Sequence, residues 1–194
     1  MKTLILAAIR CSLMFALPTA TYAISAQWDL DPVSGDWNTA DNWTPNSVPN
    51  GPADVATFDL SNTTNVSISE DTEVNGIIFT PAATNPYFIA VNAGSTLTVS
   101  EVGIMDNSGT AHQFFSFGGE VNFFNRSTAG NSTIGVTAGP VNFFDSSTAG
   151  NSRIVTHNEG TVNFFDRSTA GSALILGEEG GFLNFFDSSS AGSS

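Results

Sequence analysis

The sequence predicts an all-β protein, a β-solenoid with about 20–21 residues per coil and a Trp-rich N-terminal cap. One segment is written four times, starting at Val121, Val141, Val162 and Leu183, with spacings of 20, 21 and 21 residues. Each copy consists mainly of Val, Phe, Thr, Ser, Asn and Gly, which favour strands and turns over helices. About 20 extended residues, at roughly 3.3 Å each, make a loop about 65 Å around, the size of one three-sided coil. Coils of this kind stack through parallel strand pairing.

Residues 1–23 are typical of a secretory signal peptide. Lys2 and Arg10 come early, an apolar run extends from Cys11 to Pro18, and the small residue Ala23 marks the expected cleavage point. Arg10 interrupts the apolar stretch and leaves it well short of the ~20 residues that cross a bilayer. We therefore expect cleavage after Ala23, export of the mature chain, and no membrane span within it.

The mature chain is strongly acidic. Removing residues 1–23 takes away the only Lys and the only Cys, and leaves Arg126, Arg153 and Arg167 against 18 acidic residues, a formal charge of −15. Such a chain repels nucleic acid, because nothing offsets the phosphate charge. Without Cys the mature fold has no disulfide, and thiol and amine side-chain nucleophiles are excluded. We expect no cofactor.

Residues 24–60 contain all three Trp and are rich in Pro and other turn residues. This composition favours a cap, because the first coil of a solenoid would otherwise expose a sheet edge and an apolar cross-section. The alternative is a carbohydrate site, since the apolar face of a sugar stacks on aromatic rings. In that case the glycan contacts would be Trp28, Trp37 and Trp43.

Residues 61–120 predict irregular first coils. The short runs VSI, GIIFT, YFIAV and STLTVS alternate with turn residues and favour strands, but they do not repeat. No composition shift marks a domain boundary between these residues and the copies that follow, so we expect one continuous stack from the cap onward.

Residues 121–194 predict regular coils, the last of them unfinished. In the VNFF segment the first and third residues should point inward and the Asn outward. A second inward column is expected from Ile134, Ile154 and Ile175, each 13 residues after its unit start. The STAG segment suits a corner, where small side chains allow a bend and Gly supplies an unusual φ.

The second Phe of each unit is a candidate interaction surface. Strict alternation points it outward, and we expect the stripe to be at least half exposed and to mediate self-association or partner binding. The alternative is that a bulge or neighbouring loops cover these rings. The residues of the stripe are Phe124, Phe144, Phe165 and Phe186.

Two polar columns follow the same repeat. Asn122, Asn142, Asn163 and Asn184 are placed to form an amide ladder along the stack. Asp145, Asp166 and Asp187 stand at the fifth position, where the first unit has Asn125. Stacked carboxylates suit Ca²⁺, but Asp also commonly caps a turn, and we favour the turn. No metal site is predicted.

The sequence predicts no catalytic residue. His112 and His157 lie at non-equivalent places and are expected on the surface, outside any metal-ligand spacing. There is no G-x-S-x-G motif. Polysaccharide-cleaving β-helices use carboxylates beside a basic residue. Here the residue after the fifth position is Arg in two units and Ser in two, as expected of a variable turn position.

Several segments together resemble bacterial autotransporter-associated β-strand repeat proteins. They are Trp37, the Asn42–Trp43 pair and Pro49, then DVATFD, NGIIFT and STLTVSEVGIMDNSG, then the repeated F-x-x-S-T-A-G. The resemblance covers essentially the whole mature chain and implies a right-handed parallel β-helix. It also implies display at, or release from, a bacterial surface such as the outer membrane. A C-terminal translocator barrel or sorting anchor is not found, and the chain stops within a unit, as expected of a fragment.

We therefore expect a secreted or surface-displayed, adhesin-like structural solenoid without catalysis. The expected partners are a cell surface or a glycan, and the open solenoid end should self-associate, because a bare parallel edge invites pairing. Two alternatives remain. One is a polysaccharide-active β-helix enzyme, and the other is a carbohydrate-binding module that uses the Trp-rich cap.

Overall fold

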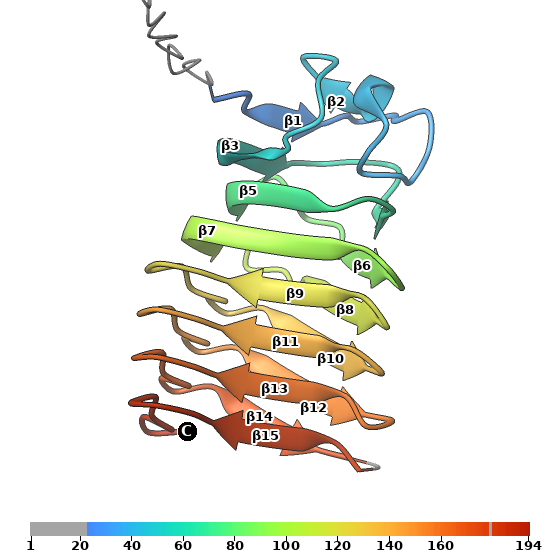
Figure 1. Ribbon diagram of the computed structural model, residues 1–194. Coiled ribbons are helices and arrows are strands. Elements are labelled where there is room, and N and C mark those ends of the chain that lie inside the picture. The colour runs from blue at the N-terminus through green and yellow to red at the C-terminus, as the bar shows by residue number, and fades with distance from the viewer. Residues whose placement is uncertain (1–22, 179) are drawn as a thin grey trace, which may run out of the picture.

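The computed structural model describes residues 23–178 and 180–194. They form a right-handed parallel β-solenoid of about six turns, and no α-helix occurs among them. Coils stack one below the other from the N-terminal to the C-terminal end, as Figure 1 shows. The predicted fold class is confirmed. The predicted signal peptide lies outside the described residues, apart from Ala23. Within the described part, no helix is long and apolar enough to cross a membrane.

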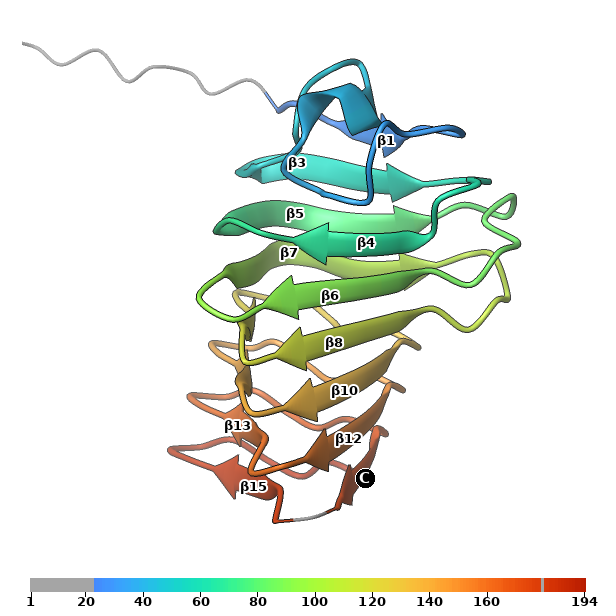
Figure 2. The ribbon, with the colours of Figure 1, turned by 90° about the vertical axis from the view of Figure 1, so that its right-hand side faces the viewer.

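From β3 onward, strands alternate along the chain between two sheets, within which they pair in parallel. Figure 2 shows the second sheet, here called sheet B, facing the viewer. Sheet A contains β1 (Ala26–Trp28), β2 (Trp43–Thr44), β3 (Gly51–Phe58), β5 (Thr72–Phe79), β7 (Thr96–Asp106), β9 (Glu120–Phe123), β11 (Pro140–Phe143), β13 (Thr161–Phe164) and β15 (Phe182–Phe185). Sheet B contains β4 (Asn65–Ile68), β6 (Phe88–Asn92), β8 (Gln113–Phe117), β10 (Thr133–Thr137), β12 (Arg153–His157) and β14 (Leu174–Gly177).

The written repeats pair in the register that their spacing predicts. Val121 lies beside Val141, Val141 beside Val162, and Val162 beside Leu183. The earlier coils are longer, because Leu97 pairs with Val121, 24 residues later. The extra residues are taken up in loops and in register shifts of β3 and β5. The irregular region therefore keeps the stacking but not the period.

The STAG corners make the third side of each repeated coil. Isolated parallel bridges join Thr128 to Thr148, Thr148 to Thr169, and Thr169 to Ser190. Gly150 has a φ of +64°, and a Cβ there would lie 2.9 Å from the carbonyl oxygen of Gly130 in the coil above. A side chain would therefore meet both strain and a backbone clash, which explains the Gly of the motif.

The core consists of columns of like side chains. Rings of Phe123, Phe143, Phe164 and Phe185 stack face to face at centroid distances of 4.7–4.9 Å and interplanar angles of 6–11°. This distance matches the ~4.8 Å between neighbouring strands, so one Phe per coil gives a continuous stack. The predicted Val and Ile columns are also inside, with Val141, Ile134 and Ile154 fully buried, except in the last coil, where Ile175 is partly buried and Leu183 is 44% exposed.

The N-terminal end is closed by residues before the first full coil. β1 pairs parallel with β3, and the two-residue β2 pairs antiparallel with β1 as the last strand of sheet A. A 3₁₀ turn, Ala40–Asn42, leads into β2. A short antiparallel strand offers little edge for a further strand, as expected of a cap. β3 pairs with β5 and belongs to the stack, and the predicted extent of the cap, residues 24–60, stays a prediction.

Candidate functional site

The three Trp of the cap do not form a surface, and their predicted glycan contact is wrong. Trp28, Trp37 and Trp43 are 0% exposed. Their rings meet edge to face, at 5.0 Å for Trp28 and Trp43 and 4.9 Å for Trp37 and Trp43. The indole N–H groups donate to the carbonyl oxygens of Thr63, Pro49 and Trp37, respectively. With faces and donors used inside the cap, none of these rings can stack on a sugar.

The outer Phe stripe is less exposed than predicted. Phe124, Phe144 and Phe165 are half-buried, and only Phe186 in the last coil reaches 44% exposure. The rings stack on one another at 4.6–4.9 Å, so each covers a face of the next. The expectation of at least half exposure is therefore wrong for all four residues, although Phe186 comes near to it. Partner binding by this stripe stays a prediction.

The predicted Asn ladder is present. The side-chain Nδ2 of Asn142 donates to Oδ1 of Asn122 at 2.9 Å, Asn163 donates to Asn142 at 2.8 Å, and Asn184 donates to Asn163 at 2.9 Å. Asn122 and Asn142 are buried although alternation directs them away from the core. The amide column is thus part of the coil-to-coil bonding, with little surface left for a ligand.

The acidic column also bonds along the stack. Asp145, Asp166 and Asp187 adopt left-handed φ values of 55–56° in the turn after each Phe pair, as does Asn125. Each carboxylate accepts the backbone N–H of the equivalent residue in the preceding coil, at 2.9, 3.0 and 3.3 Å. The acids stand in a turn, as the sequence predicted. Their hydrogen bonds, however, run between coils rather than within their own turn. In the described part of the chain, no three His, Cys, Asp or Glu side chains gather to hold a metal.

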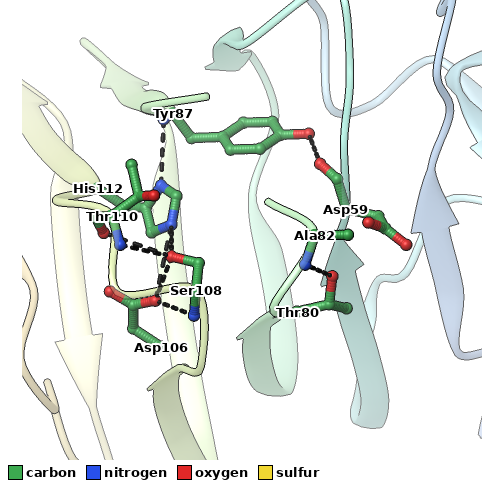
Figure 3. Close-up of polar contacts among 8 residues, drawn as sticks. All are labelled: Asp59, Thr80, Ala82, Tyr87, Asp106, Ser108, Thr110 and His112. Carbon is green, nitrogen blue, oxygen red and sulfur yellow. Dashed lines mark hydrogen bonds and ion pairs between the residues drawn. The ribbon is translucent and has the colours of Figure 1, made fainter. Parts of the chain in front are cut away.

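A buried polar cluster surrounds His112, whose predicted surface position is wrong (Figure 3). His112 is 2% exposed, and its ring stacks on Phe79 at 3.8 Å. Nδ1 accepts the backbone N–H of Tyr87 at 3.1 Å, and Nε2 lies 2.8 Å from Oγ of Ser108. Oγ of Ser108 in turn lies 2.7 Å from Oδ1 of Asp106. Serine, histidine and aspartate therefore meet, as they do in a hydrolase triad.

The hydrogen-bond directions show that this cluster is structural. Because Nδ1 accepts, the neutral ring carries its proton on Nε2 and donates it to Ser108. The Ser108 hydroxyl accepts from His112 and from the N–H of Thr110, and its own proton goes to Asp106. His112 therefore cannot take the serine proton, which is the step that activates a serine nucleophile. Burial lowers the pKa of His112 below 6.5, partly opposed by Asp106, and so favours the neutral ring.

Tyr87 belongs to the same layer of the core. Its hydroxyl donates to the carbonyl oxygen of Asp59 at 2.6 Å. Burial, assisted by the charge of Asp59, raises the pKa of Tyr87 to about 12, partly opposed by a hydrogen bond with Ser61. The phenol therefore remains a donor throughout the physiological range. Tyr87 thus joins the loop after β5 to the residue that follows β3, and His112 joins the loop after β7 to the loop after β5.

An aromatic group on sheet B was missed by the sequence reasoning. Phe88 of β6 and Phe115 of β8 stack at 4.4 Å, and Phe115 stacks on Phe117 at 5.4 Å. We call these three residues the aromatic platform. They alternate with inward residues such as Ile89 and Phe114, so they lie on the outer face, where Phe117 is 43% exposed. The alternation in FIAVN and QFFSF was the signal that could have found them.

Two grooves with mixed polar and apolar linings flank the aromatic platform. On the N-terminal side, Asp36, Asn65 and Ser67 line a groove together with Phe88. On the C-terminal side, a second groove contains Gln113, Phe115, Thr133 and Arg153. It also includes His157, whose Nδ1 lies 3.3 Å from Oε2 of Glu178. Aromatic faces therefore lie beside amide, hydroxyl and charged groups along one face of the solenoid.

A third groove, on sheet A, contains two carboxylates. Asp71 and Glu73 line it with Asn50, Thr96 and Thr98. Asp71 accepts the N–H of Thr96 at 2.9 Å, and Glu73 accepts the hydroxyl of Ser100 at 2.5 Å. Both acids thus fasten one coil to the next.

Comparisons with family models, with curated proteins and with solved structures find no match for this chain. The resemblance to autotransporter-associated repeat proteins, which the sequence motifs carry, stays a prediction.

Proposed function

We propose that this protein is an exported, adhesin-like structural solenoid that contacts cell-surface glycans through the outer face of sheet B. The observation that carries the proposal is the aromatic platform. Sugar rings have apolar C–H faces that pack on aromatic rings, while their hydroxyl groups hydrogen-bond to polar side chains. The platform supplies such rings, and the flanking grooves supply amide and hydroxyl groups.

The stacked architecture supports the structural part of the proposal. Sheet B runs through six strands in a fixed register, and each coil adds about 4.8 Å to the face. The Phe and Asn columns hold neighbouring coils together through stacked rings and amide hydrogen bonds. Such a face presents groups at regular spacing, which suits a repetitive ligand such as a polysaccharide.

A second part of the proposal is self-association through the C-terminal end of the stack. In β14 and β15 the apolar side chains of Leu174, Phe182, Leu183 and Phe185 are 38–54% exposed. An exposed parallel edge with apolar side chains favours pairing with another chain. Sedimentation at increasing concentration should show association that Leu183→Lys abolishes, and a monomeric wild-type protein would contradict this part.

Glycan-array binding tests the main proposal. We expect binding by the wild-type protein that falls at least about tenfold in Phe115→Ala and Phe117→Ala. Met105→Ala is the matched control, because Met105 is an exposed apolar residue of sheet A that lies outside both the platform and the C-terminal end. Melting curves should show that all three variants fold. Absence of binding, or equal loss in the control, would overturn the glycan role of the platform.

The proposal contains no catalytic step, and an enzyme assay tests the polysaccharide-active alternative. Incubation with acidic polysaccharides should yield no new reducing ends and no unsaturated sugars. If products appear and depend on Asp71 or Glu73, the polysaccharide-active alternative replaces the adhesin-like proposal.

A further inference from the structure

The carboxylate of Asp54 is buried and faces the start of the described chain. Asp54 lies in β3 and is 5% exposed. Its Oδ1 accepts the backbone N–H of Ile24 at 2.5 Å, and its Oδ2 accepts the N–H of Asn50 at 3.0 Å. A register shift between Gly51 and Val55 interrupts the pairing of β3 at this point. Irregularities of this kind re-aim a side chain, which here turns toward Ile24.

No cationic side chain neutralises this carboxylate. Across residues 23–178 and 180–194, the close contacts between a basic and an acidic side chain are those of His112 with Asp106 and of His157 with Glu178, and neither involves Asp54. A buried charge is costly unless it is paired and hydrogen-bonded. Asp54 has hydrogen bonds from two peptide N–H groups, but in the unprocessed chain both donors are neutral.

Cleavage after Ala23 would change the charge of one of these donors. Hydrolysis breaks the peptide bond between Ala23 and Ile24. The water oxygen adds to the Ala23 carbonyl carbon to form a carboxylate, and the nitrogen of Ile24 becomes an amine. The ordinary pKa of an α-amino group is about 7.7–8.0, so this amine is mostly protonated at neutral pH. The atom that donates to Asp54 would then be an ammonium.

We propose that Asp54 is the binding site for the α-ammonium group of Ile24, which forms when the predicted signal peptide is removed. The inference rests on the export step of the proposed function and is independent of glycan binding. Ile24 precedes β1, which pairs with β3 through Ala26 and Ala56. The new ion pair fastens the free end of β1 to β3, so processing completes the cap. A charge-assisted hydrogen bond is roughly twice as strong as a neutral one.

The sequence makes the α-amine separately measurable. Lys2 is the only Lys, so a chain that starts at Ile24 has its α-amine as the only aliphatic amine. Residues 24–194 contain every described strand and can be released from an N-terminal fusion by a protease that leaves Ile24 first. Acetylation with an amine-reactive ester then adds one acetyl group, and its rate can be followed by mass spectrometry.

We expect the α-amine of the wild-type protein to acetylate about tenfold more slowly than that of Asp54→Asn, since pairing protects it. Asp41→Asn is the matched control, an exposed carboxylate of the same region, and should react like the wild type. Acetylation should lower the melting temperature by about 5 °C in the wild type and by much less in Asp54→Asn. Equal rates in all three proteins, or equal losses on acetylation, would overturn the ion pair.

A pH series provides a readout that does not depend on the folding of the Asp54 variant. Pairing with a carboxylate raises the pKa of an ammonium. The advantage of the free over the acetylated wild-type protein should therefore be complete below about pH 8 and disappear as the pH rises further. An advantage that is independent of pH would contradict the proposal.

Export is tested separately. N-terminal sequencing of the full chain exported by a bacterial host should begin at Ile24. Another start, or an uncut chain, would overturn the processing step, whereas the acetylation rates decide the ion pair on the released chain.

Discussion

The two ends of the solenoid fill the same kind of core with different aromatic geometry. In the repeated coils, Phe143 and Phe164 lie 4.7 Å apart with an angle of 6° between their rings. At the cap, Trp28 and Trp43 lie 5.0 Å apart at 81°. The Phe stack can be extended by one ring per coil. The Trp cluster cannot be extended in this way, because its edge-to-face rings fill the end of the core and leave no ring face for a further coil. Parallel ring stacking thus suits the repeated coils, and edge-to-face packing suits the cap that closes the stack.

The comparison is tested most strongly by Trp43→Ala. Trp43 is fully buried between Trp28 and Trp37, so its removal leaves a large cavity at the closed end. We expect a loss of about 5 kcal/mol in the free energy of unfolding. Urea denaturation followed by far-UV circular dichroism measures it. A loss below about 1 kcal/mol would show that the repeated coils are stable without the cap.

Phe143→Ala tests the repeated end and should cost about 3–4 kcal/mol. Phe143 stacks on two rings, whereas Phe185 stacks on one and is 38% exposed. The matched variant Phe185→Ala should therefore cost about 1–2 kcal/mol. Equal losses in the two variants, measured in the same urea titration, would contradict a column in which inner rings contribute more than the end ring.

Asn142→Ala removes one amide from the ladder. Asn142 donates to Asn122 and accepts from Asn163, so both neighbours lose a partner at a mostly buried position. We expect a loss of about 1–3 kcal/mol. Asn184→Ala, at the end of the same ladder, should cost less. Thermal melting of both variants checks the order, and a reversed order would argue against cross-coil amide bonding.

His112 makes the stability of the fold sensitive to acid. Its pKa is lowered by burial, so the unfolded chain binds the proton more readily than the folded one. The stability contribution is complete above about pH 6.5 and falls as the pH drops toward the lower folded pKa. Melting temperatures between pH 7.5 and 5 should therefore fall less steeply in His112→Gln than in the wild type. Parallel curves would contradict this assignment.

Asp145→Asn should have the smallest effect, within about 0.5 kcal/mol. Asn tolerates the left-handed φ of 56° and already occupies the equivalent position, Asn125. Asp145→Val should cost about 1–2 kcal/mol, because a β-branched residue is strained there. Added Ca²⁺ should change neither melting temperature. Stabilisation of the wild type but not of Asp145→Asn by Ca²⁺ would revive the calcium alternative.

How much the sequence predicted differs between the two regions for a physical reason. In residues 121–194 the period itself gives the register, so the Phe, Val, Ile and Asn columns could be predicted. In residues 24–117 no period shows which residue lies above which. His112 and Tyr87 meet from positions 25 residues apart, and Phe88 and Phe115 from positions 27 apart. Their burial or exposure depends on loop lengths that a single sequence does not reveal.

The Asn ladder gives the stack a chemical direction. Asn142, Asn163 and Asn184 each donate toward the N-terminal coil, and every carboxylate of the acidic column accepts from that coil. The C-terminal face therefore presents an amide oxygen from Asn184 and a backbone N–H from Asp187, in fixed positions. A further coil matches this face only if it has an amide donor at the second position of the repeat unit and an acid at the fifth. Each coil therefore selects the coil that can stack on it, because two residues per turn must match before the amide and carboxylate hydrogen bonds can form.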